Sequence, residues 1–83
     1  MKKEEIKKVI EKFKNYSLNE FELIRSFESI RNDITESHLY DYRELMSNVI
    51  CDLEILYFTT EDDAKRSFFL ARIKELESQL KLS

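Results

Sequence analysis

The stretch from Glu36 to Phe58 constrains the fold of this chain more than any other. Its main apolar residues recur at steps of three and four, a spacing that aligns them along one face of a helix. These residues are Leu39, Tyr42, Met46, Val49, Leu53 and Leu56. Leu45, Ile50 and Tyr57 widen the apolar face, so this helix needs neighbours on more than one side. We therefore expect it to be the central element of a helical bundle.

The same periodicity predicts three further helices. A short amphipathic helix covers residues 3–15, and a long helix covers residues 60–81. Between the first helix and the central one, a second short helix is expected to start at a capping box. In that box the side chains of Ser17 and Glu20 each accept the other's backbone amide. Its buried face is expected to include Phe21. The predicted fold is all-α, an up-and-down bundle of four helices, two short and two long, in a single domain over residues 1–83.

Glycine and proline are both absent from the chain. Without glycine, the glycine-rich loops that cradle phosphates are excluded. No apolar run approaches the roughly 20 residues needed to span a membrane, and the lysine-rich start lacks the apolar block of a signal peptide. We expect a cytoplasmic protein. The single Cys51 cannot form an internal disulfide, which agrees with a reducing compartment.

Catalytic and metal chemistry have few candidate residues. His38 is the only histidine, and Ser37, His38 and Asp41 are neighbours along one helix, where side chains diverge rather than converge as in a catalytic triad. His38 and Cys51 supply two zinc ligands at most, and the acidic residues 61–63 lack the pattern of a calcium loop. We predict no enzyme activity, no cofactor and no metal site. Cys51 is interpreted as a small buried or half-buried side chain, with a reactive thiol as the alternative.

Charges are distributed unevenly along the chain. The net charge of −3 and the pI near 5.2 argue against a nucleic-acid-binding domain, which normally has a basic face. Residues 2–15 carry six lysines and three glutamates, whereas residues 36–58 carry one arginine and five acidic residues. This polarity could let the first helix dock near the central one. The first helix is interpreted as an ordinary exposed amphipathic helix rather than a membrane-binding one.

The outer face of the central helix is the candidate binding site. If its apolar face points inward, aromatic, aliphatic and acidic side chains lie on or beside the opposite face. They are Tyr40, Asp41, Glu44, Asn48, Glu54, Ile55 and Phe58. Such a mixture offers anchors for burial and charges that steer a partner. The alternative is that the first and last helices cover Ile55 and Phe58 and leave ordinary solvated charges.

The leading functional prediction is a non-enzymatic protein-binding module. We expect an acidic inhibitor, immunity or antitoxin protein, of a bacterial or phage kind, that binds a basic protein through this face. Neither nucleic acid nor a membrane is expected as a direct partner. The alternative is a structural or regulatory homodimer, in which the two long helices pair with their copy and bury Ile55, Phe58 and Phe68. Some apolar surface should stay open on the monomer, because the two short helices cannot cover the two long ones.

Overall fold

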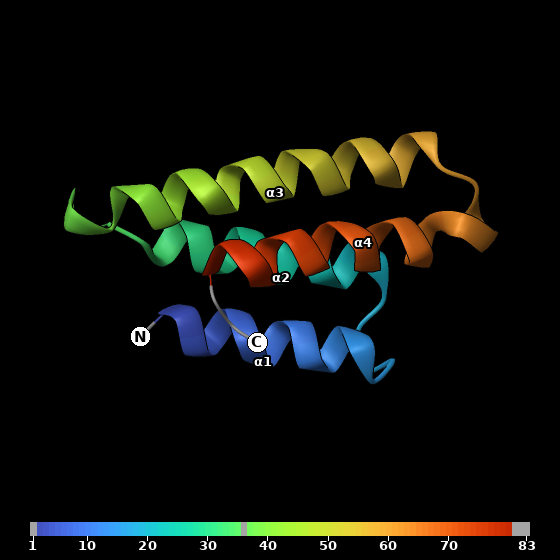
Figure 1. Cartoon of the computed structure of the whole chain (residues 1–83), viewed down its shortest axis with the longest axis horizontal. Coiled ribbons are helices and arrows are strands. Elements are labelled where there is room, and N and C mark those ends of the chain that lie inside the picture. The colour runs from blue at the N-terminus through green and yellow to red at the C-terminus, as the bar shows by residue number, and fades with distance from the viewer. Residues whose placement is uncertain (1, 36, 81–83) are drawn as a thin grey trace.

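Residues 2–35 and 37–80 are described by the structure, a computed structural model of the chain. Within them it has four α-helices, one short 3-10 helix and no strand. These elements are α1 (Lys2–Lys14), α2 (Glu20–Asp33), η1 (Ser37–Leu39), α3 (Tyr40–Thr59) and α4 (Asp62–Leu80). Successive α-helices run in opposite directions and form an elongated bundle of 39 × 22 × 19 Å (Figure 1). The predicted all-α, up-and-down bundle with two short and two long helices is confirmed. The predicted last residue of the final helix, residue 81, lies outside the described residues.

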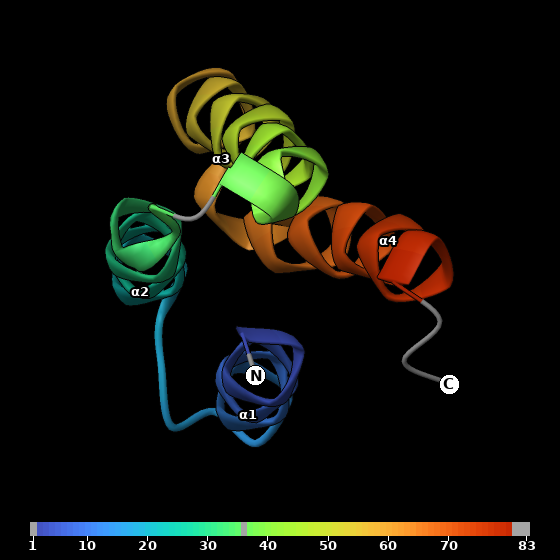
Figure 2. The same cartoon turned by 90° about the vertical axis from the view of Figure 1, so that its left-hand side faces the viewer.

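The helices occupy four corners when the bundle is viewed end-on, and α1 lies diagonally across from α3 (Figure 2). Helix α3 packs against α2 on one side and against α4 on the other, as its broad apolar face requires. Helix α1 packs mainly against α2 and more lightly against α4. The lysine-rich α1 is therefore not docked on the acidic α3. The opposite charges of the two helices lie on opposite corners of the molecule.

The core runs along the axis of the bundle and receives apolar side chains from every α-helix. Helix α3 contributes the inner part of its predicted apolar face, namely Met46, Val49, Ile50 and Leu53. Helices α1 and α4 meet through Phe13 and Phe69, whose ring centroids are 6.1 Å apart. Both rings are fully buried, and burying such a side chain contributes roughly 1.5–3 kcal/mol. No polar or charged residue is buried among the residues with described burial.

The predicted capping box at Ser17 and Glu20 is wrong. The Ser17 amide instead donates to the Lys12 carbonyl oxygen at 2.8 Å, which makes Ser17 part of the C-terminal cap of α1. Two residues later, the Asn19 side chain accepts the Glu22 amide at 2.8 Å, and the Glu22 carboxylate accepts the Asn19 amide at 2.9 Å. This is a complete capping box, and it starts α2 at Glu20.

Tyr16 closes α1 in a left-handed backbone conformation, with φ of 65°. Glycine usually takes this position at the end of a helix, but the chain has none. Arg66 of α4 supports the turn: its guanidinium lies 4.0 Å from the centroid of the Tyr16 ring and 4.4 Å from that of Phe13. The same group donates hydrogen bonds to the carbonyl oxygens of Phe13 and Lys14 at the end of α1, and the Phe13 oxygen also accepts the amide of Tyr16 at 3.1 Å. Arg66 thus fastens the end of α1 to α4.

Candidate protein-binding surface

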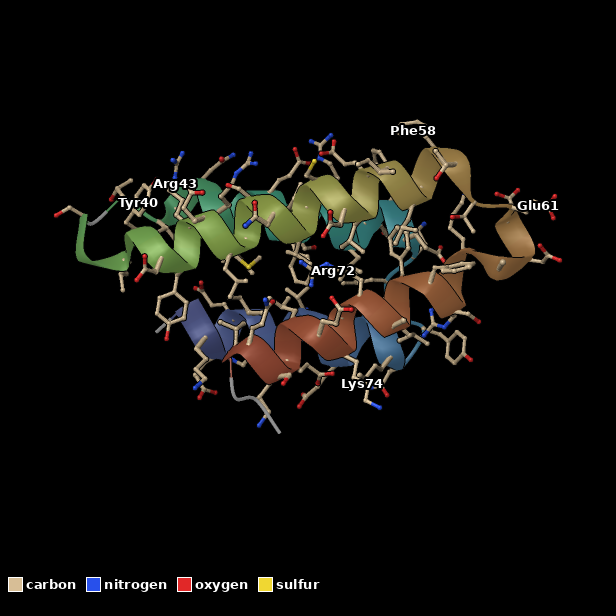
Figure 3. All side chains as sticks on the ribbon, turned by 45° about the horizontal axis from the view of Figure 1, so that its top comes forward. Tyr40, Arg43, Phe58, Glu61, Arg72 and Lys74 are labelled. Carbon is tan, nitrogen blue, oxygen red and sulfur yellow. The ribbon has the colours of Figure 1, made fainter. Side chains whose placement is uncertain are left out.

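All seven residues predicted to bind a partner are exposed on α3. Tyr40 is 60% exposed, Ile55 56% and Phe58 81%. Neither α1 nor α4 covers Ile55 and Phe58, which was the alternative that the sequence left open. Figure 3 shows Tyr40 near one end of α3 and Phe58 near the other, so the exposed face extends over the whole helix.

Cys51 belongs to the same surface, against its interpretation as a buried or half-buried side chain. Its thiol is free and exposed. Cys51 lies four residues before Ile55 and seven before Phe58, a spacing that places all three along one side of a helix. The helical position alone was enough to find it, but the general tendency of cysteine to be buried outweighed that signal. We define the α3 outer face as the seven predicted residues together with Cys51.

The α3 outer face combines apolar anchors with negative charge. Asp41 and Glu54 make no ion pair among the residues that the structure describes. Glu44 accepts a hydrogen bond from the Tyr40 hydroxyl, and this bond, with the negative charge of Glu44, raises the pKa of Tyr40 above its ordinary value of 10.0. Burial and the charge of Asp41 act in the same direction, and Arg43 opposes them. The neutral phenol is therefore favoured over the phenolate.

An ion pair between Asp52 and Arg72 joins α3 to α4 beside the α3 outer face. Arg72 Nε is 2.7 Å from Asp52 Oδ2, and the arginine side chain is mostly buried between the two helices (Figure 3). Arg72 Nη1 is 3.6 Å from the Glu75 carboxylate and has no hydrogen-bond partner. This ion pair orients the two long helices. Because the Asp52 carboxylate is already bound to Arg72, it is less available to a partner protein than the carboxylates of Asp41 and Glu54.

A second exposed group of side chains lies where α3 ends and α2 begins. Phe21 and Tyr57 have ring centroids 6.2 Å apart, and Tyr57 meets Phe58 edge-on at 5.2 Å. We call these three residues the aromatic corner. Phe21 was expected to be buried but is 50% exposed. A groove of about 240 Å³ beside it is lined by Asn19, Glu20, Phe21, Tyr57, Asp62 and Lys65. Sequence reasoning missed this group because its members come from different helices.

Catalytic and metal-binding arrangements were also sought. Within residues 2–35 and 37–80, no group of three or more His, Cys, Asp or Glu side chains could hold a metal ion. The side chain of His38 lies outside the described residues, so its geometry with Ser37 and Asp41 is not described. The described helices include no segment suited to spanning a lipid bilayer. Comparison with models of known protein families gave no match, and comparisons with curated proteins and with solved structures gave none either.

Proposed function

We propose that this chain is a non-enzymatic protein-binding module of the acidic inhibitor, immunity or antitoxin type, which binds a basic protein through the α3 outer face. The observation that carries the proposal is the exposure of large apolar side chains and unpaired carboxylates together on one helix. Ile55 and Phe58 offer area that a partner can bury, and Tyr40 offers a ring with a polar end. The free thiol of Cys51 favours a reducing compartment, so we place the protein in the cytoplasm.

The charge pattern supports a basic partner in particular. Asp41, Glu44 and Glu54 are exposed on the α3 outer face, whereas the lysines of α1 lie on the opposite corner of the bundle. A positively charged partner is therefore attracted to one side of the molecule and repelled from the other. Such asymmetry orients an encounter and raises the association rate, and added salt screens it.

Cys51 provides a direct test, because it is the only cysteine and it lies in the middle of the face. A photoactivatable cross-linker attached to its thiol is expected to capture a basic protein from a lysate of the native cells, and 0.5 M NaCl should suppress the capture. The control carries the same cross-linker on α2, at exposed Ser29, in a Cys51→Ser, Ser29→Cys variant. Capture of the same proteins from both positions, or capture that salt leaves unchanged, would contradict the proposal.

The captured protein then allows a measurement of affinity. Replacing Tyr40, Asp41 and Glu44 together by alanine is expected to weaken its binding by about tenfold or more, since anchors at an interface each contribute about 1 kcal/mol or more. All three residues are exposed, so the variant should keep the helical circular-dichroism spectrum of the parent. Unchanged affinity in a folded triple variant rules out the α3 outer face as the binding site.

A homodimer is the second candidate, and the position of Phe68 supports it. Phe68 of α4 is 51% exposed. It precedes Arg72 by one helical turn, and Ile55 follows Asp52 by about one turn, so both apolar side chains lie on the side of the Asp52–Arg72 ion pair. A second copy could bury Ile55 and Phe68 together with Phe58. If the homodimer forms, the cross-linker on Cys51 is expected to capture a second copy of this chain.

A further inference from the structure

Two cations already lie against the rings of the aromatic corner. The Lys65 ammonium is 4.3 Å from the centroid of the Tyr57 ring, and the Arg25 guanidinium carbon is 5.8 Å from that of Phe21. Lys65 is also bound to Asp62, with 2.9 Å between Nζ and Oδ1. The corner therefore holds an ammonium group between a ring face and a carboxylate. This combination is the usual way in which proteins recognise organic cations.

Phe58 is the third ring of the corner, and no cation of the described residues lies against it. Its ring touches only the edge of Tyr57 among the ring contacts of the described residues, and it is 81% exposed. Glu54 lies one turn earlier on α3, the spacing at which side chains on a helix meet. Glu61 lies beyond the end of α3, at the same end of the bundle as Phe58 (Figure 3). An exposed ring with one carboxylate a turn earlier on the same helix and another at the same end of the bundle is an open counterpart of the pair that Lys65 and Tyr57 form.

We propose that the aromatic corner receives a cationic side chain of the partner protein, most favourably the guanidinium of an arginine, with Phe58 as its stacking surface and Glu54 as its counter-ion. This inference rests on the proposed function and names the chemical group that the basic partner presents. Arginine suits the site better than lysine, because its flat guanidinium stacks on rings, binds carboxylates with two hydrogen bonds and is weakly hydrated. The groove beside the corner adds Glu20 to the negative lining, whereas Asp62 in the same groove is already paired with Lys65.

The test is a nuclear magnetic resonance titration of the isotope-labelled full chain with two peptides at low salt. One peptide alternates arginine with glycine, and the other has citrulline in place of each arginine, which keeps the size and the planar shape but removes the charge and exchanges one terminal NH2 donor group for a carbonyl oxygen. The arginine peptide is expected to shift the ring signals of Phe21, Tyr57 and Phe58 and the amide signals near them. The citrulline peptide should shift them by less than about a third as much at equal concentration, since the cation supplies most of the attraction.

Leucine variants separate the aromatic ring from apolar area in general. Phe58→Leu is expected to weaken binding of the arginine peptide about threefold, because an exposed cation–π contact contributes a factor of this size. Phe68→Leu is the matched control, since it removes an exposed phenylalanine on α4 that makes no ring contact with a cation among the described residues. Its affinity should stay within about 1.5-fold of the parent. Glu54→Gln should weaken the arginine peptide about twofold and leave the amide spectrum otherwise unchanged.

Four results would overturn the inference. The first is a set of shifts confined to the Tyr40 end of α3, which leaves the proposed function standing on its own cross-linking test. The second is equal binding of the arginine and citrulline peptides. The third is a Phe58 signal that moves with protein concentration in the absence of peptide, because a second copy of the chain then occupies the corner. The fourth is the absence of any shift in the signals of the aromatic corner at millimolar peptide, whichever protein the cross-linker on Cys51 captures.

Discussion

Tyr40 shows how a single residue can be set up for binding by its immediate neighbours. It stands at the first position of α3, and Glu44, one turn later, is the main cause of the raised pKa of Tyr40. The carboxylate disfavours the phenolate, so the exposed ring keeps a neutral hydroxyl that can donate a hydrogen bond to a partner. The raised pKa is the measurable sign of this arrangement.

Glu44→Gln is expected to bring the pKa of Tyr40 back towards its ordinary value of 10.0. The carboxylate disfavours the phenolate and accepts the hydrogen bond of the phenol, and a neutral amide does much less of either. Because the pKa is raised in the folded protein, the stabilising contribution is complete below about pH 10 and is lost as the pH rises through the folded pKa. A carbon-13 titration of the tyrosine rings measures the change. Glu54→Gln, much further along α3, serves as the control and should leave Tyr40 unchanged.

Phe21 and Cys51 mark the limit of prediction at the residue scale. Both are apolar enough to be assigned to a core, and both are exposed. Phe21 lies in the first turn of α2, and Cys51 lies on the exposed side of α3, at helical spacing from the exposed Ile55 and Phe58. Periodicity places a residue on a helix face, but the burial of that face depends on which helix lies against it.

At the scale of elements, the start of α2 is where the capping box expected at Ser17 was wrong and a second match to the same pattern is used. Ser17 with Glu20 and Asn19 with Glu22 both match the pattern of a capping box. The structure uses the second pair, because the Ser17 amide is already bound to the Lys12 carbonyl oxygen in the cap of α1. One local motif thus excludes the other, and the choice follows from where α1 ends.

Asn19→Ala is expected to lower the free energy of unfolding by about 1 kcal/mol, the usual contribution of an N-cap side chain. Ser17→Ala is the matched control and should change it by less than about 0.5 kcal/mol, since the backbone of Ser17 makes the contact with Lys12. Urea unfolding followed by circular dichroism gives both values. A larger loss in Ser17→Ala than in Asn19→Ala would contradict the observed cap.

Arg66→Met is expected to lower the free energy of unfolding by about 1–3 kcal/mol. Methionine keeps the aliphatic length but removes the guanidinium that binds the last carbonyl oxygens of α1 and contacts Phe13 and Tyr16. Lys74→Met on the same helix is the control, because Lys74 is exposed and has no partner in the described part of the chain (Figure 3). It should stay within about 0.5 kcal/mol of the parent. Equal effects of the two substitutions would show that Arg66 does not fasten α1.

At the scale of the whole molecule, the charge asymmetry and the exposed apolar side chains meet on one side. The basic α1 and the acidic α3 lie at opposite corners, and most of the large exposed apolar side chains among the described residues belong to α3 and α4, namely Tyr40, Ile55, Phe58 and Phe68. The exceptions are Tyr16, which follows α1, and Phe21 of α2. The two short helices cover one side of the two long ones and leave the other side open. This open side is what the chain offers to a partner, whether a foreign protein or a second copy.

Light scattering coupled to size-exclusion chromatography is expected to give a mass near the 10.1 kDa of one chain at micromolar concentration. The unpaired carboxylates Asp41 and Glu54 repel their own copies across a symmetric contact, so the α3 outer face is better suited to a basic partner than to itself. Measurement over a hundredfold range of concentration and at two salt concentrations makes the result decisive. A mass of twice 10.1 kDa that Phe58→Leu and Phe68→Leu reduce would favour the homodimer instead.

The sequence by itself determined that the chain forms four amphipathic helices and which face of α3 is apolar. These properties follow from spacings of three and four residues, which a helix converts directly into faces. The same spacing was sufficient to predict the seven exposed residues of the α3 outer face. Only the tertiary structure decided that α1 lies opposite α3, that Arg66 closes α1, and that Phe21 meets Tyr57 beside Lys65. Those contacts join residues far apart in the chain, so they depend on how the helices pack rather than on any local pattern.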